Sequence, residues 1–329
     1  MTQSSESVGV PRLPRPEIDA ELRAGLAIVG GVFPPTITPD LIPFMRRSYA
    51  SPPLDEILHG RRVDHREYRI KGHEGDDIVV SVFSSPDHVG TRPVILYAHS
   101  GGLMFGDRFN ALALNLDWVE RLGAVLVTPE YRLAPEYPDP YAREDLYATL
   151  VWIFDSARAL RVDSSRIMVA GASAGGGLAA GVALASRDRG GPALCGQLLV
   201  YPMLDDRGTA LSTKQFDAVG VWDRVSNETG WRAVLGDRYR TDEVSPYIAP
   251  ARATDLAGLP PAYLDVGSAE IFRDEAVGYA TALWHAGSDA ELHVWNGGFH
   301  AFDIFAPHTT LAQEMIRTRA AWVENRLAD

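Results

Sequence analysis

The sequence of 329 residues contains a single cysteine, Cys195, and only two lysines, Lys71 and Lys214. One cysteine excludes an intrachain disulfide and a cluster of metal-binding thiolates. Cys195 lies in the apolar stretch PALCGQLLVYP, which indicates a buried, unreactive thiol. The near absence of lysine beside many arginines indicates a coding bias rather than a function.

Excess basic charge and long apolar runs are also absent. The formal net charge of −12 argues against a nucleic-acid partner, because nucleic-acid-binding proteins carry a basic surface. No apolar run approaches the roughly 20 residues that span a bilayer. The N-terminal stretch has no basic segment followed by an apolar one, as a secretory signal would. We therefore expect a cytoplasmic protein without a membrane span.

What the sequence does contain is typical of a globular protein with a large core, with 46% hydrophobic and 22% charged residues. Two strand patterns, REYRIKG and DIVVSVFSS, predict an antiparallel pair with HEGD at the turn. Apolar runs then alternate with helical patterns, which predicts an α/β fold whose mostly parallel sheet is covered on both faces. The apolar runs are 93–99, 124–131, 166–172, 197–203, 262–267 and 291–296, and the helical patterns are 112–122, 142–160, 174–188, 271–286 and 309–327.

Two parts of the chain lie outside this alternation. Residues 1–60 are predicted to form a disordered tail of about a dozen residues and two cap helices, near 17–30 and 39–50. Residues 204–260 separate two strand patterns, hold Trp222 and Trp231 and include a helical stretch near 225–236. Because insertions in α/β sheets cluster where ligands bind, we expect this segment to complete the cap. A surface insertion without a role in binding is the alternative. The remaining segments, 61–203 and 261–329, would form the two parts of the core.

The stretch VAGASAGGGLAAG holds one serine among glycines and alanines, directly after the strand pattern RIMVA. Gly171, Ser173 and Gly175 fit the G-x-S-x-G turn, in which a nucleophilic serine occupies a strained corner between a strand and a helix. Glycine is needed two residues before and after the serine, because a Cβ there would clash. The N-terminus of the following helix favours the oxyanion formed in acyl transfer. Close helix–sheet packing explains such a turn without chemistry. Phosphate binding is a weaker alternative, because the lysine of the P-loop and the G-x-G-x-x-G spacing are missing.

A second glycine-rich motif, HSGG, directly follows the strand pattern PVILYA. The backbone N–H groups of Gly101 and Gly102, together with that of Ala174 after the nucleophile, are predicted to bind the oxyanion. His99 precedes the serine in the chain, so we expect it to anchor this loop rather than to act as the base. An ordinary glycine turn explains this motif alone but not the two motifs together.

The general base should follow the nucleophile and the acid in the order Ser, acid, His. The histidines after Ser173 are His285, His293, His300 and His308. His300 lies in NGGFHAFD, a loop after the last strand pattern, which is the expected place. The others lie in a helical pattern, in a strand pattern and before the final helix. A lone loop histidine is usually a surface residue, and His300 is predicted as the base because of the other motifs.

Several rare motifs in this order closely resemble the hormone-sensitive-lipase-type carboxylesterases of the α/β hydrolase superfamily, over roughly residues 60 to 325. The resemblance implies an eight-stranded sheet, a mostly helical cap and serine-dependent ester hydrolysis. Homodimers are common among such relatives, which makes a homodimer a possibility here. The motifs are HSGG, PEYRLAPEYPDPYARED, GASAGGGLA, YPMLDD, SPYIAPARATDLAGLPPAYLDVGSAEIFRDEA and GFHAFD.

The sequence departs from this family's pattern at three places. Ser100 stands at the first glycine of His-Gly-Gly-Gly, and Ala172 stands where relatives often have aspartate. The segment that commonly begins with Asp-Pro-Leu begins here with Glu270, so the family pattern places a glutamate at the acid position. Either carboxylate can orient a histidine. Asp265 and Asp274 are the competing acids, the first inside a strand pattern and the second about one turn into a helix.

The resemblance implies a serine carboxylesterase that hydrolyses small esters through an acyl-enzyme intermediate, with Ser173, Glu270 and His300 as catalytic residues. An enclosed pocket below the cap would favour short acyl chains. The reaction needs no metal and no organic cofactor, and the predicted partner is a small-molecule ester.

Other functions fit parts of the same pattern. An amidase of the formamidase kind or a lactone hydrolase would use the same residues on another substrate. A non-enzymatic receptor on this scaffold would keep the pocket and lose the base, and an α/β nucleotide-binding protein would use the glycine-rich turn for phosphate.

Overall fold

A single eight-stranded sheet organises the computed structural model, which describes residues 13–30 and 33–328. The strand order is β1-β2-β4-β3-β5-β6-β7-β8. β1 and β4 each pair antiparallel with β2, and every other neighbouring pair is parallel. The predicted α/β fold with a mostly parallel sheet is therefore confirmed. The strands are β1 (Asp64–Lys71), β2 (Asp77–Ser84), β3 (Arg92–Ala98), β4 (Val125–Pro129), β5 (Val162–Ala172), β6 (Gly196–Val200), β7 (Ala262–Gly267) and β8 (Ala290–Trp295).

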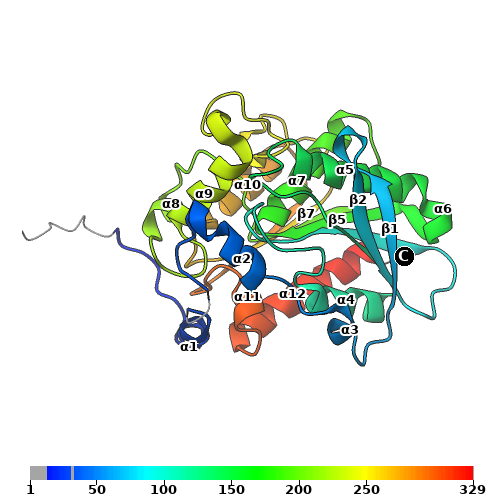
Figure 1. Cartoon of the computed structure of the whole chain (residues 1–329), viewed down its shortest axis with the longest axis horizontal. Coiled ribbons are helices and arrows are strands. Elements are labelled where there is room, and N and C mark those ends of the chain that lie inside the picture. The colour runs from blue at the N-terminus through cyan, green and yellow to red at the C-terminus, as the bar shows by residue number, and fades with distance from the viewer. Residues whose placement is uncertain (1–12, 31–32, 329) are drawn as a thin grey trace, which may run out of the picture.

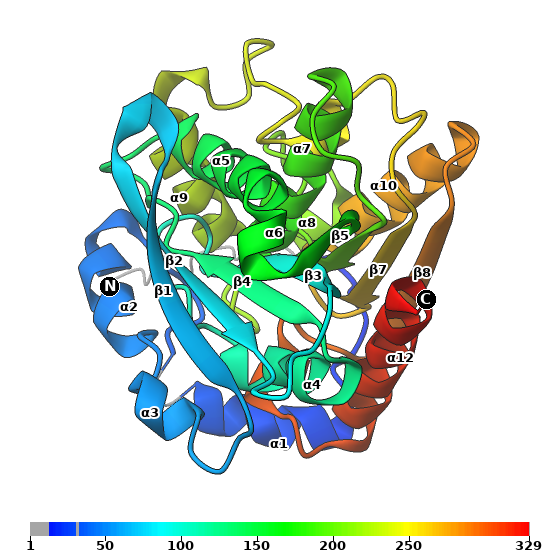
Figure 2. The same ribbon diagram turned by 90° about the vertical axis from the view of Figure 1, so that its right-hand side faces the viewer.

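Helices cover both faces of this sheet. Figure 2 shows α5 and α7 on one face and α4 and α12 on the other. No helix in the described ranges is long and apolar enough to cross a membrane. The α-helices are α1 (Ala20–Val29), α2 (Ile42–Ser48), α3 (Leu54–Ile57), α4 (Leu112–Leu122), α5 (Tyr141–Asp155), α6 (Ala157–Leu160), α7 (Ala174–Asp188), α8 (Leu211–Gln215), α9 (Arg224–Leu235), α10 (Arg273–His285), α11 (Phe302–Phe305) and α12 (Thr310–Leu327).

Apolar sequence runs explain which strands are central. Every residue of β4, β6 and β7 is buried, as expected for parallel strands that are covered by helices on both faces. The outer strands β1 and β8 expose several of their side chains. The hairpin of β1 and β2 turns at His73–Gly75, within the predicted HEGD turn.

The structure differs from the sequence prediction in a few elements. The helical pattern at 142–160 is divided into α5 and α6, because the backbone of Ser156 leaves the helical conformation. β5 begins at Val162, four residues before the predicted 166. The polar residues 163–165 at its start do not form an apolar run, so the sequence pattern does not show this part of the strand. The short helices α3, α8 and α11 have too few residues to produce a periodic apolar pattern.

The N-terminal segment lies against the 204–260 insertion, as Figure 1 shows for α2 beside α9. The hydroxyl of Thr36 donates to Asp223 at 2.6 Å, and the backbone N–H of Ile37 donates to Ser226 Oγ at 2.8 Å. The two sequence segments predicted to form a cap are therefore in direct contact. The predicted disordered tail at residues 1–12 lies outside the described residues.

The two ends of the insertion are joined to each other, and its later part packs on the core helix α7. The guanidinium of Arg252 donates to both oxygens of the buried Asp206, at 2.5 and 2.9 Å, which joins the two ends. A Cβ on Gly181 of α7 would lie 2.0 Å from the carbonyl oxygen of Tyr247. The glycines of α7 therefore allow the insertion to approach that helix closely.

Candidate active site

Ser173 lies at the corner between β5 and α7, with φ 57° and ψ −121°. Its backbone N–H donates to the carbonyl of Val200, and its own carbonyl accepts from Met203. A Cβ on Gly171 would lie 2.1 Å from the carbonyl oxygen of Gly175, and one on Gly175 would lie 2.1 Å from that of Ala98. The two glycines of the motif are therefore required by backbone contacts, and the strained conformation at the serine is held by neighbouring strands.

The side chains of Ser173, His300 and Glu270 lie in one line of contacts. Ser173 Oγ is 3.0 Å from His300 Nε2, and His300 Nδ1 is 2.5 Å from Glu270 Oε2. All three side chains are buried. The second oxygen of Glu270 accepts a hydrogen bond from the backbone N–H of Gly267 at 2.9 Å, which fixes the carboxylate. The structure thus brings together the three residues that the sequence predicted.

Two aromatic rings hold the imidazole of His300 from the sides. The ring of Tyr201 lies 4.8 Å from it at 73°, and that of Phe272 lies 5.0 Å from it at 74°. Both contacts are edge-to-face, a favourable geometry for aromatic pairs. His300 is therefore restricted to the orientation in which its two nitrogens face Ser173 and Glu270.

The competing acids have other partners. Asp274 accepts hydrogen bonds from the Ser212 backbone and from Arg273. Asp265 is buried and accepts from Arg319 of α12 at 3.1 Å. Among the later histidines, His293 lies 2.8 Å from Glu291 on β8. None of these four contacts involves Ser173 or His300.

The loop after β3 is anchored by His99, as predicted. The His99 ring stacks on Tyr131 with a centroid distance of 4.1 Å, and the Tyr131 hydroxyl donates to the His99 carbonyl at 2.8 Å. His99 Nδ1 is 2.7 Å from the carbonyl oxygen of Ser100. Burial lowers the pKa of His99, which keeps the imidazole neutral at pH 7.

Gly101 and Gly102 follow in conformations with φ +120° and +60°. A Cβ on Gly101 would lie 1.9 Å from the carbonyl oxygen of Phe105, and one on Gly102 would lie 2.1 Å from the indole of Trp222. In the described part of the chain, no backbone carbonyl accepts a hydrogen bond from the N–H groups of Gly101, Gly102 or Ala174. These three N–H groups are therefore available to an oxygen atom of a ligand.

A small pocket of about 330 Å³ opens beside Ser173 and His300. Six aromatic rings line its wall, and they come from three parts of the chain. Phe33 and Tyr49 belong to the N-terminal segment, and Trp222 belongs to the insertion. The core supplies Phe105, Tyr201 and Phe305. Most of these wall residues carry no signal in the sequence, although Tyr201 directly follows the carboxyl end of a strand, which is a place where ligands bind.

Tyr201 also connects the pocket to a buried charged cluster. Its hydroxyl donates to Asp303 Oδ1 at 3.0 Å, and Arg319 donates to Asp303 Oδ2 at 2.9 Å and to Asp265 at 3.1 Å. Tyr201 has φ +35°, a conformation that tyrosine rarely adopts. The cluster therefore fixes a strained residue at the edge of the pocket.

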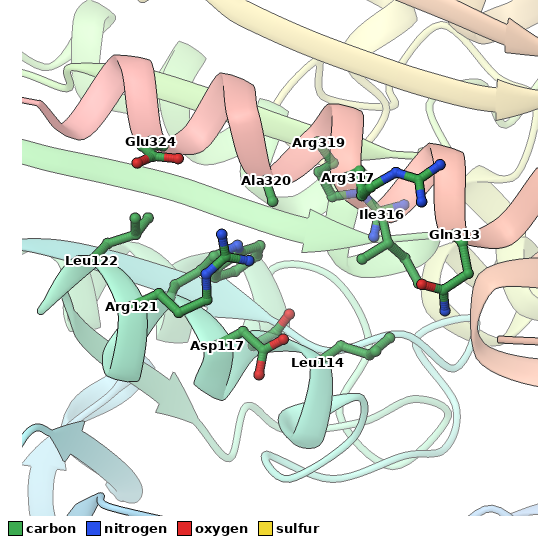
Figure 3. Close-up of a pocket in the computed structure, with 12 residues that line it drawn as sticks. Leu114, Asp117, Arg121, Leu122, Gln313, Ile316, Arg317, Arg319, Ala320 and Glu324 are labelled. Carbon is green, nitrogen blue, oxygen red and sulfur yellow. The ribbon is translucent and has the colours of Figure 1, made fainter. Parts of the chain in front are cut away.

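A larger cavity lies between α4 and α12 (Figure 3), and its described wall includes Arg319 but neither Ser173 nor His300. Its described wall has apolar positions such as Leu114 and Ile316 and charged side chains such as Arg121 and Glu324, but no serine, cysteine or histidine. This cavity has no nucleophile and base for acyl transfer, so the candidate active site is the smaller pocket. In the described ranges, no cluster of His, Cys, Asp and Glu side chains is placed to hold a metal ion.

Comparison with known proteins places the chain in a family. A model of the alpha/beta hydrolase fold matches residues 95–304. The chain is 35% identical over 290 residues to carboxylesterase NlhH of Mycobacterium tuberculosis, covering 86% of this chain and 88% of that protein. It is 25% identical over 298 residues to an ethyl acetate hydrolase of Pseudomonas putida, covering 81% of this chain and 92% of that protein.

Solved structures agree with these relatives. A bacterial heroin esterase superposes with a TM-score of 0.87 at 33% identity, covering 95% of this chain and 98% of that one. The sheet topology, the family match and the curated relatives lead to one conclusion. The chain belongs to the hormone-sensitive-lipase-type carboxylesterases of the α/β hydrolase superfamily and is a carboxylic ester hydrolase.

Proposed function

We propose that the protein hydrolyses small esters with short acyl chains through an acyl-enzyme intermediate on Ser173. The observation that carries this proposal is the line of contacts from Ser173 Oγ through His300 to Glu270, with distances of 3.0 and 2.5 Å. An ionised carboxylate only accepts hydrogen bonds, so it keeps the proton on Nδ1 and leaves Nε2 to face the serine as a base.

The chemistry follows from this tautomer. Nε2 of His300 takes the hydroxyl proton while Ser173 Oγ bonds to the ester carbonyl carbon, and the carbonyl electrons move to oxygen. The tetrahedral intermediate collapses, its bond to the alcohol oxygen breaks, and His300 donates the proton to the departing alcohol. Water then attacks the acyl-enzyme by the same route, which releases the carboxylic acid and restores Ser173.

We assign the oxyanion site to the backbone N–H groups of Gly101, Gly102 and Ala174. They lack backbone acceptors in the described chain. Gly101 and Gly102 line the pocket, and Ala174 directly follows the serine. Ala174 is the first residue of α7, so its N–H also belongs to the positive end of that helix. Donors fixed in this way stabilise the charge that develops on the carbonyl oxygen.

We infer a preference for short acyl chains from the small size of the pocket. Its free space is about 330 Å³ including the open mouth, and aromatic rings line its wall, which leaves little room for a long chain. Residues 1–60 and 204–260 would form the cap, because Phe33, Tyr49 and Trp222 from these segments reach the pocket wall. The similarity to an ethyl acetate hydrolase supports a small substrate.

A panel of p-nitrophenyl esters tests this function. We expect kcat/KM to be highest for acyl groups of about four carbons or fewer and to fall at least ~10-fold by about eight carbons. A second series with a fixed acetyl group and alcohols of increasing size separates the two ends of the substrate. A higher kcat/KM for decanoate than for butyrate would contradict the proposed limit on acyl length.

The same assay discriminates the alternatives. Faster turnover of a matched amide or lactone than of the ester would indicate an amidase or a lactone hydrolase. Binding without turnover of any of them would indicate a receptor. No observation in the structure favours these three functions over ester hydrolysis. A homodimer and a cytoplasmic location stay predictions.

A further inference from the structure

Tyr49 belongs to the N-terminal segment, outside the core fold, but it reaches the candidate active site. It directly follows α2, and its ring lines the same pocket as Ser173 and His300. The ring is only half-buried, whereas its hydroxyl lies beside the buried Ser100, at 2.9 Å from Ser100 Oγ. Burial raises the pKa of Tyr49, so the hydroxyl keeps its proton and can donate it.

The direction of the hydrogen bonds follows from the number of protons. Ser100 has one hydroxyl proton, and it donates this proton to Asn110 Oδ1 at 2.6 Å. Ser100 Oγ must then be the acceptor for Tyr49, so the order is Tyr49 to Ser100 to Asn110. Ser100 stands where the related esterases have the first glycine of the His-Gly-Gly-Gly loop, and glycine has no side chain to accept this bond.

Two further rings restrict Tyr49. Phe33 lies 5.8 Å from it at 76°, and Phe105 lies 5.3 Å from it at 85°, both edge-to-face. The phenol is therefore fixed by a hydrogen bond at its tip and by aromatic contacts along its sides. A side chain fixed in this way forms a rigid wall.

The backbone around Tyr49 has separate attachments to the same loop. Arg46 donates to the carbonyl of Met104 at 2.9 Å and forms an ion pair with Glu136. The backbone N–H of Ser51 donates to Asp107 at 2.8 Å. Because these contacts do not involve the Tyr49 side chain, α2 should stay in place when that side chain is changed.

We propose that Tyr49 is a specificity-determining residue that limits the size of the ester group beside the oxyanion loop, and that Ser100 is the positioning residue that holds it there. The proposal rests on ester hydrolysis at Ser173. It goes beyond that function because it assigns the limit on substrate size to one ring and to one hydrogen bond.

The test compares Tyr49→Ala, Tyr49→Phe, Ser100→Ala and the double variant Tyr49→Phe/Ser100→Ala. The readout is the ratio of kcat/KM for octanoate to that for butyrate, and the corresponding ratio in the alcohol series. Tyr49→Ala should raise at least one of these ratios by ~10-fold or more, because it removes the wall. Tyr49→Phe and Ser100→Ala should each raise the same ratio by ~2- to 5-fold. The double variant should match the single variants, because all three lose the same bond.

Unchanged ratios in a folded Tyr49→Ala protein would overturn the proposal. Additive effects of Tyr49→Phe and Ser100→Ala would overturn the role of the hydrogen bond. Each variant is also treated with an organophosphonate probe, and the adduct is located by mass spectrometry. An adduct on Ser173 shows that the proposed nucleophile works, so a failure to change the ratios then concerns Tyr49 alone. An adduct at another residue would instead contradict the proposed function.

Discussion

Glu270 Oε2 lies 2.5 Å from Nδ1 of His300, at the ring nitrogen that faces away from Ser173. Glu270→Gln keeps the shape of the side chain but removes the charge that fixes the tautomer and stabilises the imidazolium. We expect kcat to fall ~10²- to 10⁴-fold with little change in KM. Glu270→Asp should retain more activity, although its shorter side chain brings the carboxylate less close. Steady-state kinetics on p-nitrophenyl butyrate measures both.

Asp274→Asn is the matched control for this prediction, because Asp274 is the nearest rival in the sequence and bonds to Ser212 and Arg273 instead. Loss of turnover in Asp274→Asn together with full activity in Glu270→Gln, in two equally folded proteins, would assign the acid to Asp274.

Removal of the nucleophile should abolish the covalent route. Ser173→Ala should lower kcat by at least ~10³-fold while the circular dichroism spectrum and the melting temperature stay close to those of the wild type. An organophosphonate should add once to the wild-type protein, at Ser173, and should not add to the variant. If the probe labelled both proteins at one residue other than Ser173, Ser173 would not be the nucleophile.

Gly102 is a sensitive position in the oxyanion loop. Its φ is +60°, and a Cβ would lie 2.1 Å from the indole of Trp222, so Gly102→Ala must displace either the loop or the insertion. We expect kcat/KM to fall by about 10²-fold, because a displacement of about 1 Å misplaces the oxyanion donors. Gly278→Ala in α10 serves as the control, since nothing lies within 4 Å of its Cβ position. Gly278→Ala should keep full activity and gain ~0.5 to 1 kcal/mol of stability. Equal activities of the two variants would contradict the predicted role of this loop.

Asp265 should make the free energy of unfolding fall as the pH rises from about 4 to 6. Burial raises its pKa to about 6, although Arg319 opposes the shift. Between roughly pH 4 and 6 the folded protein holds a proton that the unfolded chain has lost, so this contribution to stability falls as the pH rises. Relative to the wild type, Asp265→Asn should therefore gain stability from pH 4 to pH 6.

Urea unfolding at several pH values measures this difference. Asp77→Asn is the control, because the hydrogen bond from Lys71 lowers the pKa of Asp77, so its contribution to stability changes mainly below roughly pH 4 and its difference from the wild type should stay nearly constant from pH 4 to 6. If the difference in unfolding free energy between Asp265→Asn and the wild type stayed constant from pH 4 to 6, the pKa of Asp265 would not be raised.

The sequence predicts the structure best where local chemistry determines it. The turn around Ser173 was predictable because its glycines are required by contacts between residues that are close in sequence or in adjacent strands. The central strands were predictable because buried parallel strands are apolar along their whole length. His300 and Glu270 were predictable from their place after strands and from the resemblance to known esterases.

The parts that were missed depend on contacts between distant segments. Nothing local indicates that Tyr49 meets Ser100, because the bond joins two loops 51 residues apart. The cluster around Arg319 was hidden for the same reason, since an arginine in a final amphipathic helix is normally exposed, whereas this one is buried beside Asp265 and Asp303. Such contacts follow from the packing of complete elements, which periodicity does not describe.

The ion pair between Arg252 and Asp206 has a consequence for protein engineering. It closes the insertion at its base, so the segment between these two positions begins and ends at fixed points. Loop-closure entropy rises only slowly with length, so exchanged segments of different length should be tolerated when this pair and Gly181 are retained. Exchanging parts of residues 207–251, while keeping the pair and the contacts of Trp222, Asp223 and Ser226 with the oxyanion loop and the N-terminal segment, would therefore offer a route to new substrate ranges.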